Sequence, residues 1–216
     1  MPGIVSQYST GAQRAKLSGF DGVEIHNANG YLLDQFLRDG TNHRTDAYGG
    51  PARNRARFTL EVAEAVTKLW GADRVGIRFS PGGVFNDMRD SDPLATFSHG
   101  LHELNRFQLA YAHLIVSTED DLRHGAVPVP LAALRKEFHG PLIVANGFTR
   151  ATATQALAED LADAVAFGRL FIANPDLPQR FRLNASLNAP DESTYYGGAA
   201  RGYTDYPALG PQFVQR

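Results

Sequence analysis

The stretch GVEIHNANGYLLDQF, residues 22–36, begins like a buried β-strand and then changes character. Val23 and Ile25 alternate with polar residues, which is the period of a strand with one apolar face. A histidine, two asparagines, a glycine and a tyrosine follow before the chain returns to leucines. This composition indicates either a loop that only turns the chain or a functional site at the end of a strand.

The composition is that of an ordinary globular protein. Of its 216 residues, 43% are hydrophobic and 20% are charged, which is enough apolar mass for one core and one domain over residues 1–216. The formal net charge is −2 and the basic residues are scattered, so neither nucleic acid nor an acidic membrane surface is expected as a partner. The absence of cysteine excludes disulfides, thiolate metal sites and cysteine nucleophiles.

The sequence offers no targeting or membrane signal. No apolar run approaches the roughly 20 residues that a membrane-spanning helix needs. The start, MPGIVSQYST, lacks the basic and apolar pattern of a secretion signal. We therefore expect a cytoplasmic protein.

Short apolar runs alternate with longer amphipathic segments, which is the pattern of a parallel α/β architecture. Apolar residues three and four apart predict helices around 58–69 and 94–104, the second capped by Asp92 with Pro93 after it. Shorter helices are expected at 130–138 and 149–160 and from Asn174 onward, and an irregular tail over about 186–216. Strands are expected at 21–26, 74–80, 111–117, 140–146 and 162–168.

Strand parity places two ionisable side chains on one face of the predicted sheet. Glu24 and His26 point opposite to Val23 and Ile25, and Arg78 points opposite to the apolar face of the second strand. In a (β/α) barrel this polar face near the carboxyl ends of the strands is the inward, active-site end. A structural role, with His26 and Arg78 paired to Glu24 or to backbone, is an equally good reading of these residues alone.

Five groups of motifs follow one another along nearly the whole chain. They are GFDGVEIHNANGYLLDQFLRDGTNHRTDAYGG at 19–50, DRVGIRFSP and GVFNDM within 73–88, VANGFTR at 144–150, AFGRLFIANPDLPQR at 166–180 and STYYGGAARGYTDYP at 193–207. In this order they resemble the Old Yellow Enzyme family of FMN-dependent oxidoreductases. The resemblance implies a TIM-type (β/α)8 barrel that uses NAD(P)H to reduce the activated C=C bond of α,β-unsaturated carbonyl or nitro compounds.

The resemblance assigns catalytic roles at the first strand. His26 and Asn29 match the pair that hydrogen-bonds the substrate's carbonyl or nitro oxygen, where negative charge develops during hydride addition. Tyr31 matches the proton donor. Phe85 and Tyr196 match aromatic residues of the substrate cavity, as does Tyr195, with Tyr196 the better candidate for direct contact.

The resemblance also assigns the FMN-binding residues. Arg78 matches a residue that contacts the flavin near N1. The phosphate is expected at the loops after the last two strands, where glycines permit close backbone approach. One loop holds Asn146 and Gly147, and the other holds Gly168 and Arg169. The alternative is that these glycines only turn the chain.

The motif order identifies the five predicted strands as the fourth to the eighth of such a barrel. A barrel of this class takes about 250 residues, so the first three strands, which carry part of the flavin site, are expected to be missing. The predicted edge strands, 21–26 and 162–168, favour self-association or a second chain that supplies strands one to three. A catalytic part of an ene-reductase, a non-catalytic fragment that has lost flavin, and a different phosphate-binding barrel enzyme all remain open.

Overall fold

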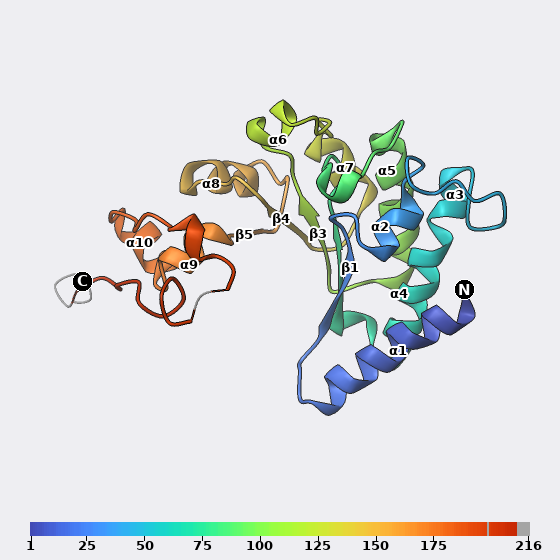
Figure 1. Ribbon diagram of the computed structural model, residues 1–216, viewed down its shortest axis with the longest axis horizontal. Coiled ribbons are helices and arrows are strands. Elements are labelled where there is room, and N and C mark those ends of the chain that lie inside the picture. The colour runs from blue at the N-terminus through green and yellow to red at the C-terminus, as the bar shows by residue number, and fades with distance from the viewer. Residues whose placement is uncertain (198, 211–216) are drawn as a thin grey trace.

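The computed structural model describes residues 1–197 and 199–210, which include a five-stranded parallel sheet in the order β1-β2-β3-β4-β5 (Figure 1). Spatial order equals chain order, so each connection moves the chain one strand along, as in the wall of a barrel. The predicted strands are confirmed, each shorter than expected, and β1 and β5 are the edges. Their bounds are β1 Val23–Asn27, β2 Val75–Phe79, β3 Tyr111–Ile115, β4 Leu142–Ala145 and β5 Ala164–Ala166.

Helices lie between the strands, and none in the described residues is long and apolar enough to cross a bilayer. The Asp92 cap is confirmed, because its carboxylate accepts the amide N–H of Ala95 at 3.0 Å. The helices are α1 Pro2–Leu17, α2 Leu32–Leu37, α3 Ala52–Arg55, α4 Arg57–Trp70, α5 Pro93–Leu104, α6 Glu119–Arg123, α7 Leu131–Glu137, α8 Arg150–Ala158, α9 Arg169–Ala173 and α10 Leu177–Leu183. Short 3-10 turns lie at Ala72–Arg74, Phe85–Asp87, Asn105–Phe107 and Glu192–Thr194.

The prediction of a helix start at Asn174 is wrong. Asn174 ends α9, and its fully buried side chain donates to the carbonyls of Leu170 and Asn188. The next helix, α10, begins at Leu177, and Pro178 takes the first-turn position that the sequence suggested for Pro175. The Asn174 side chain makes hydrogen bonds to the Leu170 and Asn188 carbonyls instead of capping a helix, so the local sequence signal for a helix start did not hold.

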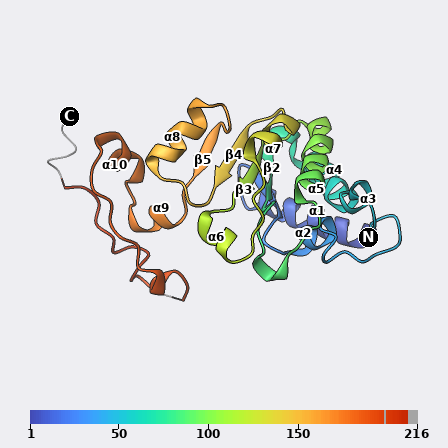
Figure 2. The ribbon, with the colours of Figure 1, turned by 90° about the horizontal axis from the view of Figure 1, so that it is seen from above.

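The two faces of the sheet differ in character. Val75, Ile77 and Phe79 are buried, and the Phe79 ring packs edge-on against Phe97 of α5 with centroids 5.8 Å apart. Figures 1 and 2 show α4 and α5 along this side of the sheet. The opposite face of β1 and β2 carries Glu24 and Arg78 with partial exposure. Burying the apolar face under helices leaves the polar face for a site, as strand parity predicted.

The C-terminal segment beyond α10 extends past β5 (Figure 2). Its described part is irregular apart from the turn Glu192–Thr194. The buried guanidinium of Arg180 fastens it, donating to the carbonyls of Ser186 and Pro207. Of the predicted tail 186–216, residues 198 and 211–216 lie outside the described residues.

Candidate active site

The loop that follows β1 makes a sharp turn built from left-handed residues. Asn29 has φ 56° and Gly30 has φ 73°. The amide N–H of Asn29 donates to Ser80 Oγ at 2.8 Å, and that of Gly30 donates to the Asp34 carboxylate at 2.9 Å. The turn then leads into α2 at Tyr31, its N-cap residue. This geometry gathers His26, Asn29 and Tyr31 at the carboxyl end of β1.

His26 and Tyr31 are neighbours across this turn. Their rings meet edge-on with centroids 5.1 Å apart. Burial and then the positive charge of Arg78 lower the pKa of His26 below its ordinary value of 6.5, against the opposing effect of Glu24 and Asp34. His26 is therefore neutral at pH 7, and a neutral imidazole can still donate one hydrogen bond.

A buried ion pair forms the base of the loop. Asp34 is fully buried and Arg38 is 2% exposed, with Nε of Arg38 2.8 Å from the carboxylate. The same guanidinium donates to the carbonyls of Ser80 and Gly83 in the loop after β2. The sequence analysis missed this pair, although the i, i+4 spacing of Asp34 and Arg38 was a visible signal.

Arg78 lies on β2 in register with His26 on β1. Its Nε is buried and meets no acceptor within residues 1–197 and 199–210. A buried N–H without a partner carries a substantial desolvation cost, so this donor fits an acceptor atom on a bound group.

The expected structural alternative, in which Glu24 pairs with His26 or Arg78, is not what the structure shows. The Glu24 carboxylate contacts Nδ1 of His113 at 3.0 Å, and the Tyr111 hydroxyl lies near enough to it to affect its pKa. Tyr111 reaches it by passing over Gly76, where an added Cβ would lie 2.3 Å from the phenol ring. The sequence analysis missed both partners, although they share the polar parity of the third strand.

Ionisation in this cluster follows from its contacts. Burial by itself would raise the pKa of Glu24, but the hydrogen bonds from His113 and Tyr111, with the charge of Arg78, lower it overall. Burial and the Glu24 charge raise the pKa of Tyr111 to about 12. At neutral pH Glu24 is therefore negatively charged and Tyr111 is protonated. Glu24 pairs with Gly76, two residues before Arg78 on β2.

Hydrogen bonds to the segment after β3 fix the loop after β4. Asn146 has φ 86°, and its side-chain amide donates to the Val116 carbonyl and to the Asp121 carboxylate, so this side chain braces the loop. Gly147 has φ 73°, and a Cβ there would lie 2.4 Å from Thr118 Cγ2. Glycine is therefore required at this position by the packing within the protein.

The second predicted phosphate loop follows β5. Gly168 is the N-cap of α9, and Arg169 is its first residue. Backbone amides in a first helical turn have no intrahelical acceptor. Burial opposes ionisation of Asp121, but hydrogen bonds from Thr118 and Asn146, and the charge of Arg169, lower its pKa overall. Arg169 is thus close enough to the loop after β4 to act on it electrostatically.

The predicted substrate-cavity aromatics lie in different places. Phe85 is 62% exposed and follows β2, next to the β1 loop. Tyr196 is 91% exposed and lies on the segment that follows α10, which Figure 1 shows beyond β5, whereas His26 lies on β1 at the other edge of the sheet. The structure therefore brings Phe85, but not Tyr196, to the end of β1, because an open wall keeps its two edges apart.

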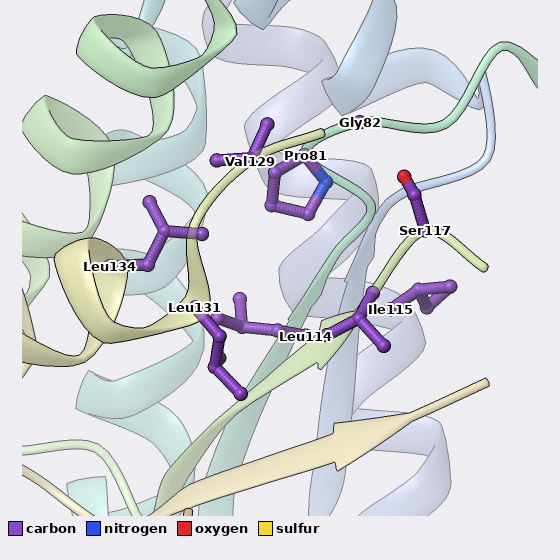
Figure 3. Close-up of a pocket in the computed structure, with 9 residues that line it drawn as sticks. Pro81, Gly82, Leu114, Ile115, Ser117, Val129, Leu131 and Leu134 are labelled. Carbon is purple, nitrogen blue, oxygen red and sulfur yellow. The ribbon is translucent and has the colours of Figure 1, made fainter. Parts of the chain in front are cut away.

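A small apolar pocket between β3 and α7 is not this site. Leu114, Leu131 and Leu134 line it below Pro81, and its volume is about 10 Å³ (Figure 3). That is room for about one water molecule. It is a packing gap in the helix-covered face.

Residues 2–188 match the sequence profile of the NADH:flavin oxidoreductase / NADH oxidase family, and the chain belongs to that family. It is 46% identical to 12-oxophytodienoate reductase 2 of Arabidopsis thaliana, over 97% of the chain and 56% of that protein. Among solved structures, morphinone reductase is similar with 50% identity and TM-score 0.90, over 96% of the chain and 56% of that protein. The old yellow enzyme from Trypanosoma cruzi is similar with 38% identity and TM-score 0.91, over 96% and 55%.

These comparisons confirm the resemblance to the Old Yellow Enzyme family and the fold class. The chain spans about half of each of these relatives. Its sheet is part of a TIM-type barrel wall, with five parallel strands in chain order.

Proposed function

We propose that this chain is part of an FMN-dependent oxidoreductase that uses NAD(P)H to reduce activated C=C bonds of α,β-unsaturated carbonyl or nitro compounds. The observation that carries the proposal is the buried Nε of Arg78, which meets no acceptor among the described residues 1–197 and 199–210, beside the neutral donor His26. A related protein, morphinone reductase, has been solved with tetrahydroNAD, which supports a nicotinamide reductant.

The residues present fit FMN. Arg78 offers the electron-rich edge of the flavin ring a positive charge and an Nε donor that no acceptor in the described part of the chain occupies. The backbone at Gly147 and Gly168, with the Arg169 side chain and the loop that Asn146 braces, would hold the phosphate. When bound, FMN supplies the hydride that no side chain can provide.

His26 and Asn29 are proposed to bind the oxygen of the substrate. The backbone N–H of Asn29 is fixed by Ser80 Oγ, and the Asn29 side-chain amide would bind the substrate's oxygen. A neutral imidazole and an amide, held in place before the reaction, stabilise the negative charge that develops on that oxygen. Phe85 would form one wall of the substrate cavity, and Tyr196 another once the two edges of the wall come together.

Tyr31 is proposed to donate the proton to the α-carbon of the alkene. It is 55% exposed at the mouth of the site and stacks edge-on against His26, so its hydroxyl is accessible to a bound substrate. Because a phenol gives up its proton with difficulty, close placement is what makes it an effective acid here.

Single substitutions test these roles in the FMN-loaded protein, that is, in the assembly that completes the barrel. His26→Ala or Asn29→Ala should slow turnover of 2-cyclohexenone by raising its activation free energy by about 2.7 to 4 kcal/mol. The flavin content should stay nearly unchanged. Tyr31→Phe should slow reduction of the alkene and spare reduction of the flavin by NADPH. Equal slowing of both half-reactions would remove Tyr31 from the proton-donor role.

We further propose that the edges of β1 and β5 are paired in the active protein, by more of the same polypeptide or by a second chain. Each unpaired buried backbone group costs about 1 to 3 kcal/mol, and an edge strand presents several. An open wall is therefore expected to bind FMN weakly and to associate. Light scattering of the purified 216-residue chain tests this, and a well-behaved monomer at micromolar concentration would contradict it.

The alternative function is a non-catalytic partial barrel that self-associates without flavin. It predicts that FMN fails to bind even when the edges are paired. Arg78 Nε, which has no acceptor within the part of the chain that the structure describes, argues against it, because a site that had lost its ligand would gain stability from an internal partner there.

A further inference from the structure

Two successive residues after β2 adopt a backbone conformation that side chains rarely take. Asn86 has φ 57° and Asp87 has φ 60°, both in the left-handed region. Asparagine and aspartate tolerate this region better than other residues, but two in a row need a compensating interaction. The strained turn carries the exposed ring of Phe85.

The compensating interaction reaches across to the loop after β1. Nδ2 of Asn86 donates to the backbone carbonyl of Asn29 at 2.9 Å. The amide N–H of Asn29 is already bound to Ser80 Oγ at 2.8 Å. Both backbone polar groups of Asn29 are therefore held by residues of the β2 loop, while Asn29 itself is left-handed.

The two loops also touch through their backbones. A Cβ added at Gly30 would lie 2.6 Å from Asn86 Cβ and 2.9 Å from the Phe85 carbonyl oxygen. Glycine is thus required at position 30 for Asn86 to come this close. The guanidinium of Arg38 holds the base of the β2 loop at Gly83 from the other side.

We propose that Asn86 is a positioning residue that fixes Asn29 and, through the same turn, the place of Phe85. The substrate-oxygen site and the Phe85 wall then keep a constant separation. We call the hydrogen bond from Asn86 Nδ2 to the Asn29 carbonyl the clasp. The effect of Asn86 on catalysis rests on the proposed function, whereas the clasp itself does not.

A matched pair of glycine substitutions tests the clasp in the 216-residue chain. Asn86→Gly and Asp87→Gly each place glycine at a left-handed position, so each relieves the same backbone strain. Only Asn86→Gly removes the hydrogen bond to Asn29, because the Asp87 side chain is exposed and pairs with Arg89. Hydrogen exchange at the amides of Asn29 and Gly30 should quicken about fivefold in Asn86→Gly and stay unchanged in Asp87→Gly.

Unchanged exchange in Asn86→Gly, or equal quickening in both variants, would overturn the clasp. In the FMN-loaded protein, Asn86→Gly should lower kcat for 2-cyclohexenone about fivefold with an unchanged Tm. Asp87→Gly should leave kcat unchanged. Quicker exchange with unchanged kcat would overturn the positioning role. Failure of the proposed function is seen separately, because the wild-type FMN-loaded protein would then not reduce 2-cyclohexenone, whereas the difference in hydrogen exchange between the two variants would remain.

Discussion

Replacement of Arg38 by methionine probes the buried pair under the active-site loop. Methionine keeps the apolar length of the side chain but leaves the Asp34 carboxylate, fully buried, without its cation. Breaking a buried pair in this way costs about 3 to 5 kcal/mol. For a chain of this size about 1 kcal/mol shifts Tm by roughly 2 to 4 °C, so the expected drop is about 6 to 20 °C.

Urea denaturation and differential scanning calorimetry measure this loss. The control is Lys68→Met, which breaks the exposed pair with Glu64 on α4 and should cost less than about 0.5 kcal/mol. The double variant Asp34→Asn/Arg38→Met removes the buried charge and should recover part of the stability. A loss below about 1 kcal/mol in Arg38→Met would refute the reasoning that this pair is desolvated and needed.

Two further substitutions test the polar face of the sheet. Gly76→Ala should destabilise the chain by about 1 to 3 kcal/mol, because the new methyl group meets the Tyr111 ring, and should be nearly neutral in a Tyr111→Ala background. The pKa of His26 is lower in the folded chain than in the unfolded one. As the pH falls, His26 is therefore protonated in the unfolded state before it is protonated in the folded state. Wild-type stability should therefore fall relative to His26→Gln as the pH drops from above 6.5 toward the lowered pKa, measured as the urea midpoint at each pH.

The sequence predicted the parts of the structure that depend on local pattern. Strand parity at Val23 and Ile25 correctly separated the apolar face from the polar one, and the order of the strands made β1 and β5 the edges. The Asp92 cap followed from a short-range rule that tertiary packing did not disturb. The strand faces and the cap involve residues within a few positions of one another, whereas the prediction of the edges came from the motif order of the family resemblance.

Apart from the Asp34–Arg38 pair, whose i, i+4 spacing is local, the missed features depend on contacts between distant segments. Glu24 meets His113, which is two strands away and 89 residues later. Asn174 was taken for a helix start, but its side chain instead fixes the segment at Asn188. The loop-bracing role of the Asn146 side chain depends on Asp121 of α6, a helix that the sequence analysis did not predict. No local rule identifies such partners.

Titration with FMN tests the central proposal most directly, namely that this wall is the Arg78-bearing part of a flavin barrel. The chain would be titrated alone and together with a polypeptide that carries the N-terminal β/α units of a full-length relative, with flavin fluorescence as the signal. We predict weak or no binding by the chain alone, and one-to-one binding in the mixture that Arg78→Met weakens. Tight one-to-one binding by the chain alone, or none in the assembled mixture, would contradict the proposal.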